Sequence, residues 1–183
     1  MRKPIVFACA SKWEMRKGLA DIPRVAALKP EYQFIIVGVD AKQMKGLPPE
    51  IIAIERTDNV DELVEIYSSA DVFINPTYDD NFPTTNIEAL ACGTPVVTYT
   101  TGGSPEALDS TTGIVVEKGD IQGFARAITE VIEGKPKKFS KEQCIARAAK
   151  FSMEDRFHEY YILYRNIFES RRVNVAEKNL RNE

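Results

Sequence analysis

The sequence contains few of the residues on which metal sites and thiol chemistry depend. Among its 183 residues there are one histidine, one tryptophan and three cysteines. Cys9, Cys92 and Cys144 are widely spaced and form no Cys-x-x-Cys pair, which disfavours both a disulfide framework and a Cys/His zinc cluster. An odd, scattered set of cysteines is typical of reduced thiols in a cytoplasmic chain. We therefore expect a cytoplasmic protein without a metal site.

Long apolar runs and an excess of one charge are also missing. No apolar run reaches the ~20 residues that span a bilayer, and a formal net charge of −3 leaves no electrostatic footprint for nucleic acid. Neither G-x-x-x-x-G-K-[ST] nor G-x-G-x-x-G occurs, so a P-loop ATPase and ordinary NAD binding are disfavoured. With 44% apolar and 28% charged residues, the composition is that of a globular domain with a sizeable core.

Short β-type runs alternate with helical patterns along the chain. The expected strands are 5–9, 34–38, 51–54, 71–75, 96–99 and 113–116, and the expected helices include 17–28, 83–92, 120–133, 140–150 and 152–168. Further helix starts are expected at the cap Asn59, with Glu62 completing a capping box, and at Ser104. This alternation predicts an α/β fold, a Rossmann-like parallel sheet with helices on both faces. Such sheets bind ligands at the carboxyl ends of their strands, here the loops 10–17, 76–82 and 100–104.

The most informative segment follows the fourth expected strand. Asp80 lies in a loop, and Glu88 follows eight positions later inside a helix. Between them, at Phe82, Pro83 and Thr84, lies the helix N-terminus, whose free N–H groups and dipole suit a phosphate. Carboxylates would repel a phosphate but bind hydroxyls. A phosphate cradle between two carboxylates therefore favours a nucleotide sugar as the ligand.

Two other loops contribute candidates at the same edge of the sheet. Lys17 begins a helix after the first strand, where a cation would neutralise a leaving diphosphate, and Arg16 and Lys12 are weaker alternatives. Gly102 and Gly103 follow the fifth strand, where they form either a simple turn or a close backbone approach to the ligand.

Taken together, the segment from Asp80 to Val97 and the following Gly102-Gly103-Ser104-Pro105-Glu106 resemble the retaining glycosyltransferases of the GT-B fold, family 4. That family carries Glu-x7-Glu followed by Ala-Met/Leu-Ala-x-Gly-x-Pro-Val-Val. The resemblance implies the C-terminal half of a GT-B fold: a donor-binding domain over 1–170, a frayed polar tail over 171–183, and an N-terminal acceptor domain that is absent.

The resemblance also implies roles for individual residues. Glu88 would bind the ribose hydroxyls, Asp80 would lie near the donor sugar and its reacting carbon, and Lys17 would bind the diphosphate. Backbone N–H groups over 82–84 would meet the phosphate or sugar. The sequence departs from the family in having Asp80 rather than Glu, and Ala10-Ser11-Lys12 where Gly-Arg is common. Lys12 or Arg16 is then the substitute for the family arginine.

The function implied is that of a retaining hexosyltransferase-type enzyme. The intact protein would transfer a sugar from a nucleotide diphosphate sugar to a glycan or lipid-linked acceptor hydroxyl, in surface polysaccharide or other glycan assembly. No metal or cofactor is expected, and the location is cytoplasmic or at the inner membrane face. The chain alone is not expected to transfer sugar efficiently. The alternatives are a GT-B nucleotide-sugar epimerase and a non-catalytic nucleotide-binding domain.

Several of these residues also have purely structural interpretations. Thr85-Asn86-Ile87-Glu88 is itself a capping-box pattern, and Lys17 could be a solvated residue at a helix start. The aromatic stripe of Tyr160, Tyr161 and Tyr164 fits either a core or a contact with the missing domain. A cluster at Lys135, Lys137 and Lys138 is either a solvated loop or a peripheral membrane contact.

Overall fold

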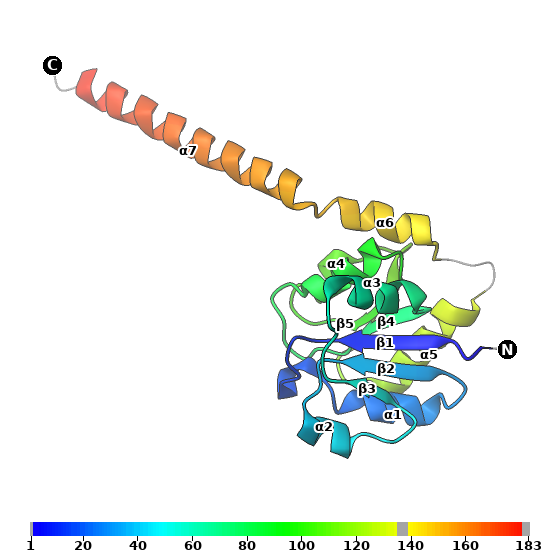
Figure 1. Cartoon of the computed structure of the whole chain (residues 1–183). Helices are drawn as coiled ribbons and strands as arrows, with labels where there is room; N and C mark the ends of the chain where they lie inside the picture. The colour runs from blue at the N-terminus through cyan, green and yellow to red at the C-terminus, as the bar shows by residue number, and fades with distance from the viewer. Residues whose placement is uncertain (1, 135–138, 181–183) are drawn as a thin grey trace. The chain divides into compact units, whose positions relative to one another are not determined.

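The computed structural model describes residues 2–134 and 139–180 (Figure 1). Its six strands are β1 (Ile5–Cys9), β2 (Gln33–Val37), β3 (Ile52–Ile54), β4 (Val72–Asn75), β5 (Val96–Tyr99) and β6 (Gly113–Val116). All neighbouring strands are parallel, in the order β3-β2-β1-β4-β5-β6. The direction of winding reverses between β1 and β4, which makes their carboxyl ends the topological switch point of the sheet. The predicted Rossmann-like sheet is thus confirmed.

Helices cover both faces of this sheet (Figure 1). On one face lie α1 (Asp21–Leu28), α2 (Ala41–Gly46) and α5 (Ile121–Glu133). The other face carries α3 (Val60–Ser69), α4 (Thr84–Ala91) and α6 (Lys141–Ala149). Because each face is covered, both sets of alternating side chains along the strands are buried.

The alternation along the strands builds two separate cores. In β1, Val6 and Ala8 join the core beneath α1 and α5, while Phe7 joins the core beneath α3 and α4. On the second face, Phe7 packs edge-on against Tyr67 with ring centroids 4.9 Å apart. Because the central strands contribute to both cores, their positions are set by packing on both faces of the sheet.

The helix cap predicted at Asn59 forms, and Asp120 caps α5 at the expected start of that helix. Asn59 Oδ1 accepts a hydrogen bond from Glu62 N at 2.8 Å, and Asp120 Oδ1 accepts one from Gly123 N at 2.8 Å. The expected capping box at Asn59 is not reciprocal, because the Glu62 carboxylate accepts instead from Asp58 N at 2.7 Å.

Three local expectations differ from the structure. The helix expected over 17–28 is divided into a 3-10 turn, η1 (Met15–Lys17), and α1, because Gly18 adopts a left-handed conformation with φ 73°. The short helix α2 is not among the expected helices. In the turn η2 (Ser104–Ala107) the N-cap is Gly103, so Ser104 is not the cap, and its buried hydroxyl has no hydrogen-bond partner among the described residues.

The C-terminal boundary also differs from the expectation of 1–170. One compact unit ends at Ala149, and a second begins at Lys150. The second contains α7 (Met153–Leu180), which remains helical where a frayed tail was expected from 171. Tyr160, Tyr161 and Tyr164 are 58–66% exposed, so they are not core residues. None of the described helices is both long enough and apolar enough to cross a membrane. The cluster at Lys135, Lys137 and Lys138 lies outside the described residues.

Candidate functional site

A pocket of about 180 Å³ opens at the switch point between β1 and β4. The end of β1 and the segment after it supply one wall, and the loop after β4 with the start of α4 supplies the other. The lining residues are Cys9, Ala10, Ser11, Trp13, Lys17, Asn75, Asp80, Phe82, Pro83, Thr84 and Thr85. Of the predicted site residues, the structure therefore brings together Lys17, Asp80, Phe82, Pro83 and Thr84.

Lys17 and Asp80 form an ion pair within this pocket. Their side chains are only 23% and 12% exposed, so the pair is partly shielded from water. The Lys17 ammonium and an Asp80 carboxylate oxygen are in hydrogen-bonding contact. In such a pair the Lys17 ammonium can bind an anionic group of a ligand, and the Asp80 carboxylate beside it can accept a hydrogen bond from a ligand hydroxyl.

The two segments that carry this pair are joined by several other hydrogen bonds. Tyr78 N donates to Arg16 O at 2.6 Å, and Arg16 Nη1 donates to Asp79 O at 3.0 Å. The Arg16 guanidinium also pairs with Glu14 at 3.0 Å. Arg16 is exposed and is not among the pocket-lining residues, so it acts as a tie between loops rather than as a second cation in the pocket.

The phosphate cradle differs in detail from the one expected. The helix α4 begins at Thr84, and Pro83 is its N-cap rather than a first-turn residue. Proline has no N–H, so no donor is available at position 83. The N–H groups of Thr84 and Thr85 occupy the first two helical positions, where no intrahelical acceptor exists. Both residues line the pocket, and their backbone N–H groups are free to donate hydrogen bonds to a phosphate there.

Glu88 lies one turn further along α4, beside the pocket rather than among its lining residues. Its carboxylate accepts a hydrogen bond from Tyr67 Oη at 3.1 Å. The capping-box interpretation is wrong, because Thr85 is inside the helix and Pro83 is the cap. Glu88 is exposed, so its carboxylate remains accessible to a ligand.

Cys9 lies at the pocket, close to Glu88, and is not poised as a nucleophile. Burial, and then the nearby Glu88 carboxylate, raise the pKa of the Cys9 thiol to about 11. The thiol is therefore protonated at neutral pH, whereas a reactive cysteine requires the thiolate.

Lys12 lines a neighbouring groove of about 590 Å³ and not the pocket itself. This groove runs past the carboxyl ends of β2 and β3 and adjoins the pocket through Ser11, which lines both. The sequence grouped Lys12 with Lys17 because both follow β1. The structure places them on separate sides of Ser11.

Gly102 and Gly103 contact the Asp80 loop rather than the pocket. Gly102 has φ 48°, and a Cβ there would lie 1.9 Å from Asp80 O. A Cβ at Gly103 would lie 2.1 Å from Asn81 O, and Gly103 N donates to that oxygen at 2.9 Å. The two glycines are therefore required because two backbone segments meet, and this contact supports the loop that carries Asp80.

The site also includes residues that were not among the predicted site residues. Asn75, at the end of β4, lines the pocket, and its amide donates to Asn86 Oδ1 at 2.9 Å. Trp13 is buried, with Nε1 donating to Val37 O at 2.9 Å. Asn75 ends a strand at the binding edge, which was a usable signal. Nothing in the sequence indicated the orientation of Trp13.

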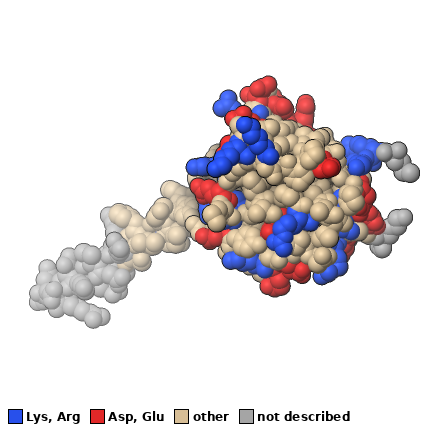
Figure 2. Space-filling model, turned by 90° about the horizontal axis from the view of Figure 1, so that it is seen from below, with Lys and Arg blue, Asp and Glu red and all other residues tan. Residues whose placement is uncertain are grey.

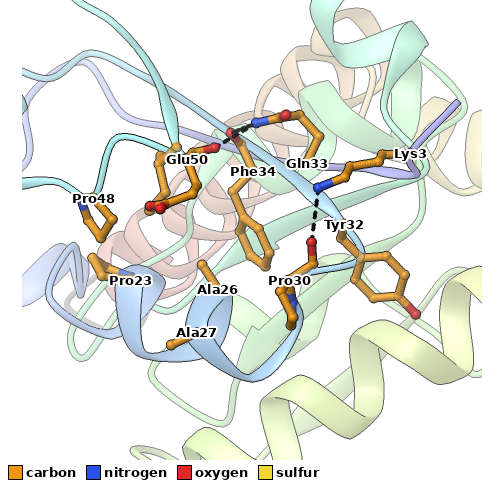
Figure 3. Close-up of a pocket in the computed structure, with 11 residues that line it drawn as sticks. Lys3, Pro23, Ala26, Ala27, Pro30, Tyr32, Gln33, Phe34, Pro48 and Glu50 are labelled. Atoms are coloured by element: carbon orange, nitrogen blue, oxygen red, sulfur yellow. Dashed lines mark hydrogen bonds between the residues drawn. The ribbon is translucent and has the colours of Figure 1, made fainter.

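The amino-terminal edge of the sheet lacks this concentration of functional groups. A cavity of about 510 Å³ lies at the opposite, amino-terminal edge of the sheet. Figure 3 shows that its walls are mostly apolar, with Lys3 and Gln33 engaged by main-chain carbonyls. On the face drawn in Figure 2, acidic and basic side chains are interspersed. Among the residues whose side chains the structure describes, 2–134 and 139–170, no group of three or more His, Cys, Asp or Glu is placed to hold a metal ion.

Comparison with known proteins identifies the family. Residues 3–134 match the family described as glycosyl transferases group 1, and the chain belongs to this family. D-inositol 3-phosphate glycosyltransferase of Mycolicibacterium gilvum is 30% identical over 142 residues, covering 70% of this chain and 32% of that protein. The same enzyme of Mycolicibacterium smegmatis is 39% identical over 93 residues, covering 50% of this chain and 21% of that protein.

Solved structures show the same fold. Sucrose-phosphate synthase of Thermosynechococcus elongatus matches with a TM-score of 0.76 at 26% identity, over 92% of this chain and 46% of that chain. HepE of Anabaena, solved in complex with UDP and glucose, matches with a TM-score of 0.68 at 21% identity, over 81% of this chain and 44% of that chain. These neighbours are GT-B glycosyltransferases. The chain spans from about a fifth to just under half of the length of the four relatives named.

Proposed function

We propose that this chain is the donor-binding half of a retaining glycosyltransferase, and that its switch-point pocket holds the diphosphate of a nucleotide sugar. The observation that carries this proposal is the convergence of Lys17, Asp80 and the start of α4 on one pocket. Lys17 and the α4 N-terminus supply positive charge for a diphosphate. Asp80 supplies an acceptor for a sugar hydroxyl.

In this proposal each residue acts by positioning or by electrostatics. The diphosphate lies against the Thr84 and Thr85 N–H groups and takes the Lys17 ammonium as a counter-ion. As the bond between sugar and phosphate breaks, negative charge grows on the leaving diphosphate, and these donors stabilise it. Glu88, exposed beside the pocket, accepts from the ribose hydroxyls. No metal ion has a part in the proposed reaction.

Similar proteins carry the names of different nucleotides and sugars. One relative, 28% identical to this chain, is named as a GDP-mannose-dependent mannosyltransferase, whereas HepE was solved with UDP and glucose. The acceptor, a glycan or lipid-linked hydroxyl, would bind a further domain, in keeping with the partial coverage of the relatives. The exposed tyrosines of α7 offer a contact surface for that domain. The protein would then act in the cytoplasm. If its acceptor is lipid-linked, it would act at the inner face of the membrane.

The proposal is tested by isothermal titration calorimetry of the chain with UDP, GDP, ADP and their common sugar conjugates. We expect saturable binding of one nucleotide series, with Asp80→Asn weakening the sugar conjugate more than the bare diphosphate. Failure of all three diphosphates to bind a folded chain at millimolar concentration would contradict the donor-site assignment.

A transfer assay distinguishes an enzyme from a binding module. A longer protein containing this chain and an acceptor domain should transfer sugar, and Asp80→Asn should abolish the transfer. Wild-type binding without transfer in that protein would favour the non-catalytic alternative. Efficient transfer by the 183-residue chain alone would contradict the division into donor and acceptor halves.

A further inference from the structure

Asp21 is a buried carboxylate that contacts the loop carrying Asp80, through Tyr78. It lies in the first turn of α1 and is 4% exposed. One carboxylate oxygen, Oδ2, accepts hydrogen bonds from the hydroxyls of Tyr78 at 2.7 Å and Tyr99 at 2.8 Å. The other, Oδ1, accepts from Arg24 Nη1 at 3.2 Å. An unpaired polar group is strongly unfavourable when buried, and these three donors provide hydrogen-bond partners for both oxygens of the Asp21 carboxylate.

The two tyrosines that meet on Asp21 come from different parts of the fold. Tyr99 ends β5 and is fully buried against Phe124, with ring centroids 4.8 Å apart. Tyr78 lies in the loop after β4, two residues before Asp80, and packs edge-on against Tyr99 at 5.6 Å. Asp21 thus ties the Asp80 loop to a fixed point in the core.

The same two chain segments are joined again at the pocket. Asp21 follows Lys17 by four residues, and Tyr78 precedes Asp80 by two. The Asp21–Tyr78 hydrogen bond and the Lys17–Asp80 ion pair are therefore neighbouring links between the same segments. A third link, from Tyr78 N to Arg16 O at 2.6 Å, joins the two segments as well.

Both tyrosine hydroxyls stay protonated at neutral pH and can therefore donate hydrogen bonds to Asp21, because the pKa of each is raised. The hydrogen bond to Asp21, followed by burial, raises the pKa of Tyr78. Burial, followed by the same carboxylate, raises the pKa of Tyr99. The facing cations are Arg24, bonded to Asp21, and Lys118, whose Nζ lies 5.5 Å from the centroid of the Tyr78 ring.

We propose that Asp21 is a positioning residue for the donor site, acting through Tyr78 to hold the Asp80 carboxylate opposite Lys17. A purely apolar contact would pack against the partly buried Tyr78 ring equally well. It would not fix the position of the hydroxyl end of the side chain, and with it the loop, because apolar packing lacks the directionality of a hydrogen bond. The ligand in this inference, a nucleoside diphosphate, rests on the proposed function, whereas the geometric claim does not.

The test compares Tyr78→Phe with Tyr99→Phe in the 183-residue chain. Each variant removes one hydroxyl donor from the same Asp21 oxygen, but only Tyr78 belongs to the loop. We expect Tyr78→Phe to weaken binding of the preferred nucleoside diphosphate by about fivefold to tenfold, the effect of losing one hydrogen bond. Tyr99→Phe should bind within about twofold of wild type and lose at least as much thermal stability.

Amide hydrogen exchange measures how firmly the Asp80 loop is held, without any ligand. Tyr78→Phe should accelerate exchange at residue 78 and at Gly103, whose N–H groups donate to Arg16 O and to the Asp80 loop. Tyr99→Phe should leave both amides at their wild-type rates relative to global unfolding. Asp21→Asn, which keeps the shape and one acceptor oxygen, should accelerate the same two amides.

Equal effects of the two tyrosine variants on binding and on these amides would overturn the positioning role and leave Asp21 as a structural residue only. If wild type binds no nucleoside diphosphate, the proposed function fails. The amide exchange then still decides whether Asp21 positions the loop.

Discussion

Lys17 and Asp80 are 63 residues apart in the chain and meet as an ion pair at the junction of β1 and β4. Each arrives on a loop that follows a central strand, so the strand order brings them together. The pair places a cation and a carboxylate side by side, next to the N-terminus of α4. This is the arrangement on which the proposed donor site depends.

The first prediction concerns Lys17. Lys17→Ala should weaken nucleoside diphosphate binding by about tenfold or more, because a hydrogen bond to a charged group contributes roughly 1.5–3 kcal/mol. Calorimetric titration measures this. Lys45→Ala, which removes an exposed lysine on α2, is the matched control and should change affinity less than twofold. Equal loss in both variants would show that only overall charge matters.

Glu88 is predicted to distinguish nucleotides from bare diphosphate. Glu88→Gln should weaken binding of the nucleoside diphosphate by about tenfold, the scale of a charge-assisted hydrogen bond. Binding of inorganic pyrophosphate, which has no ribose, should be unchanged. Tyr67→Phe is the control, since it removes the hydroxyl that holds Glu88 but leaves the carboxylate. A parallel loss of pyrophosphate affinity in Glu88→Gln would refute ribose recognition.

Gly102 is predicted to be intolerant of a side chain. Its φ is 48°, and a Cβ at this position would lie only 1.9 Å from Asp80 O, so Gly102→Ala should be destabilising by roughly 2–4 kcal/mol. Gly46, in α2, has no atom within 4 Å of a Cβ position. Gly46→Ala should therefore be neutral or stabilising by up to about 1 kcal/mol. Denaturant unfolding of both variants checks the contrast, and similar losses would show that backbone approach is not the cause.

A pH effect is predicted at Tyr32, away from the site. Its hydroxyl points towards α5 (Figure 3) and donates to Glu133 at 2.5 Å. Burial, then Glu133, raise the pKa of Tyr32 to about 12 from an unfolded value near 10. A raised pKa gives stability that is fully present below pH 10 and is lost as the pH rises towards 12.

Unfolding of Tyr32→Phe across this range provides the test. The variant should be less stable than wild type below pH 10, because the hydrogen bond is gone, and should show a shallower loss of stability above it. An identical pH dependence in the two proteins would rule out Tyr32 as its source.

The sequence was sufficient for the sheet because the strands are short apolar runs separated by turn signals. Their bounds were predicted to within one residue in each case. Lys17 and Asp80 were also predictable, since both follow strands whose carboxyl ends share an edge. The strands follow from the local hydrophobic pattern, and the two site residues follow from the rule that parallel strands end at the same edge of a sheet.

The remaining features depend on tertiary contacts. Arg16 and Lys12 belong to the same short segment as Lys17, and only the folded path of that segment decides that Lys17 alone of the three lines the pocket. The role of Gly102 required knowing which backbone lies against it. Asp21 looked like an ordinary acid at a helix start, and its two tyrosine partners lie 57 and 78 residues away.

The most direct test of the donor-site account is a two-dimensional NMR titration of the chain with UDP, GDP and ADP. The account predicts saturable shifts for one of them at the amides of Ser11, Lys17, Asp80, Thr84 and Thr85, and loss of those shifts in Lys17→Ala. Saturable shifts confined to the apolar cavity at the opposite edge of the sheet, around Phe34 and Glu50, would contradict it.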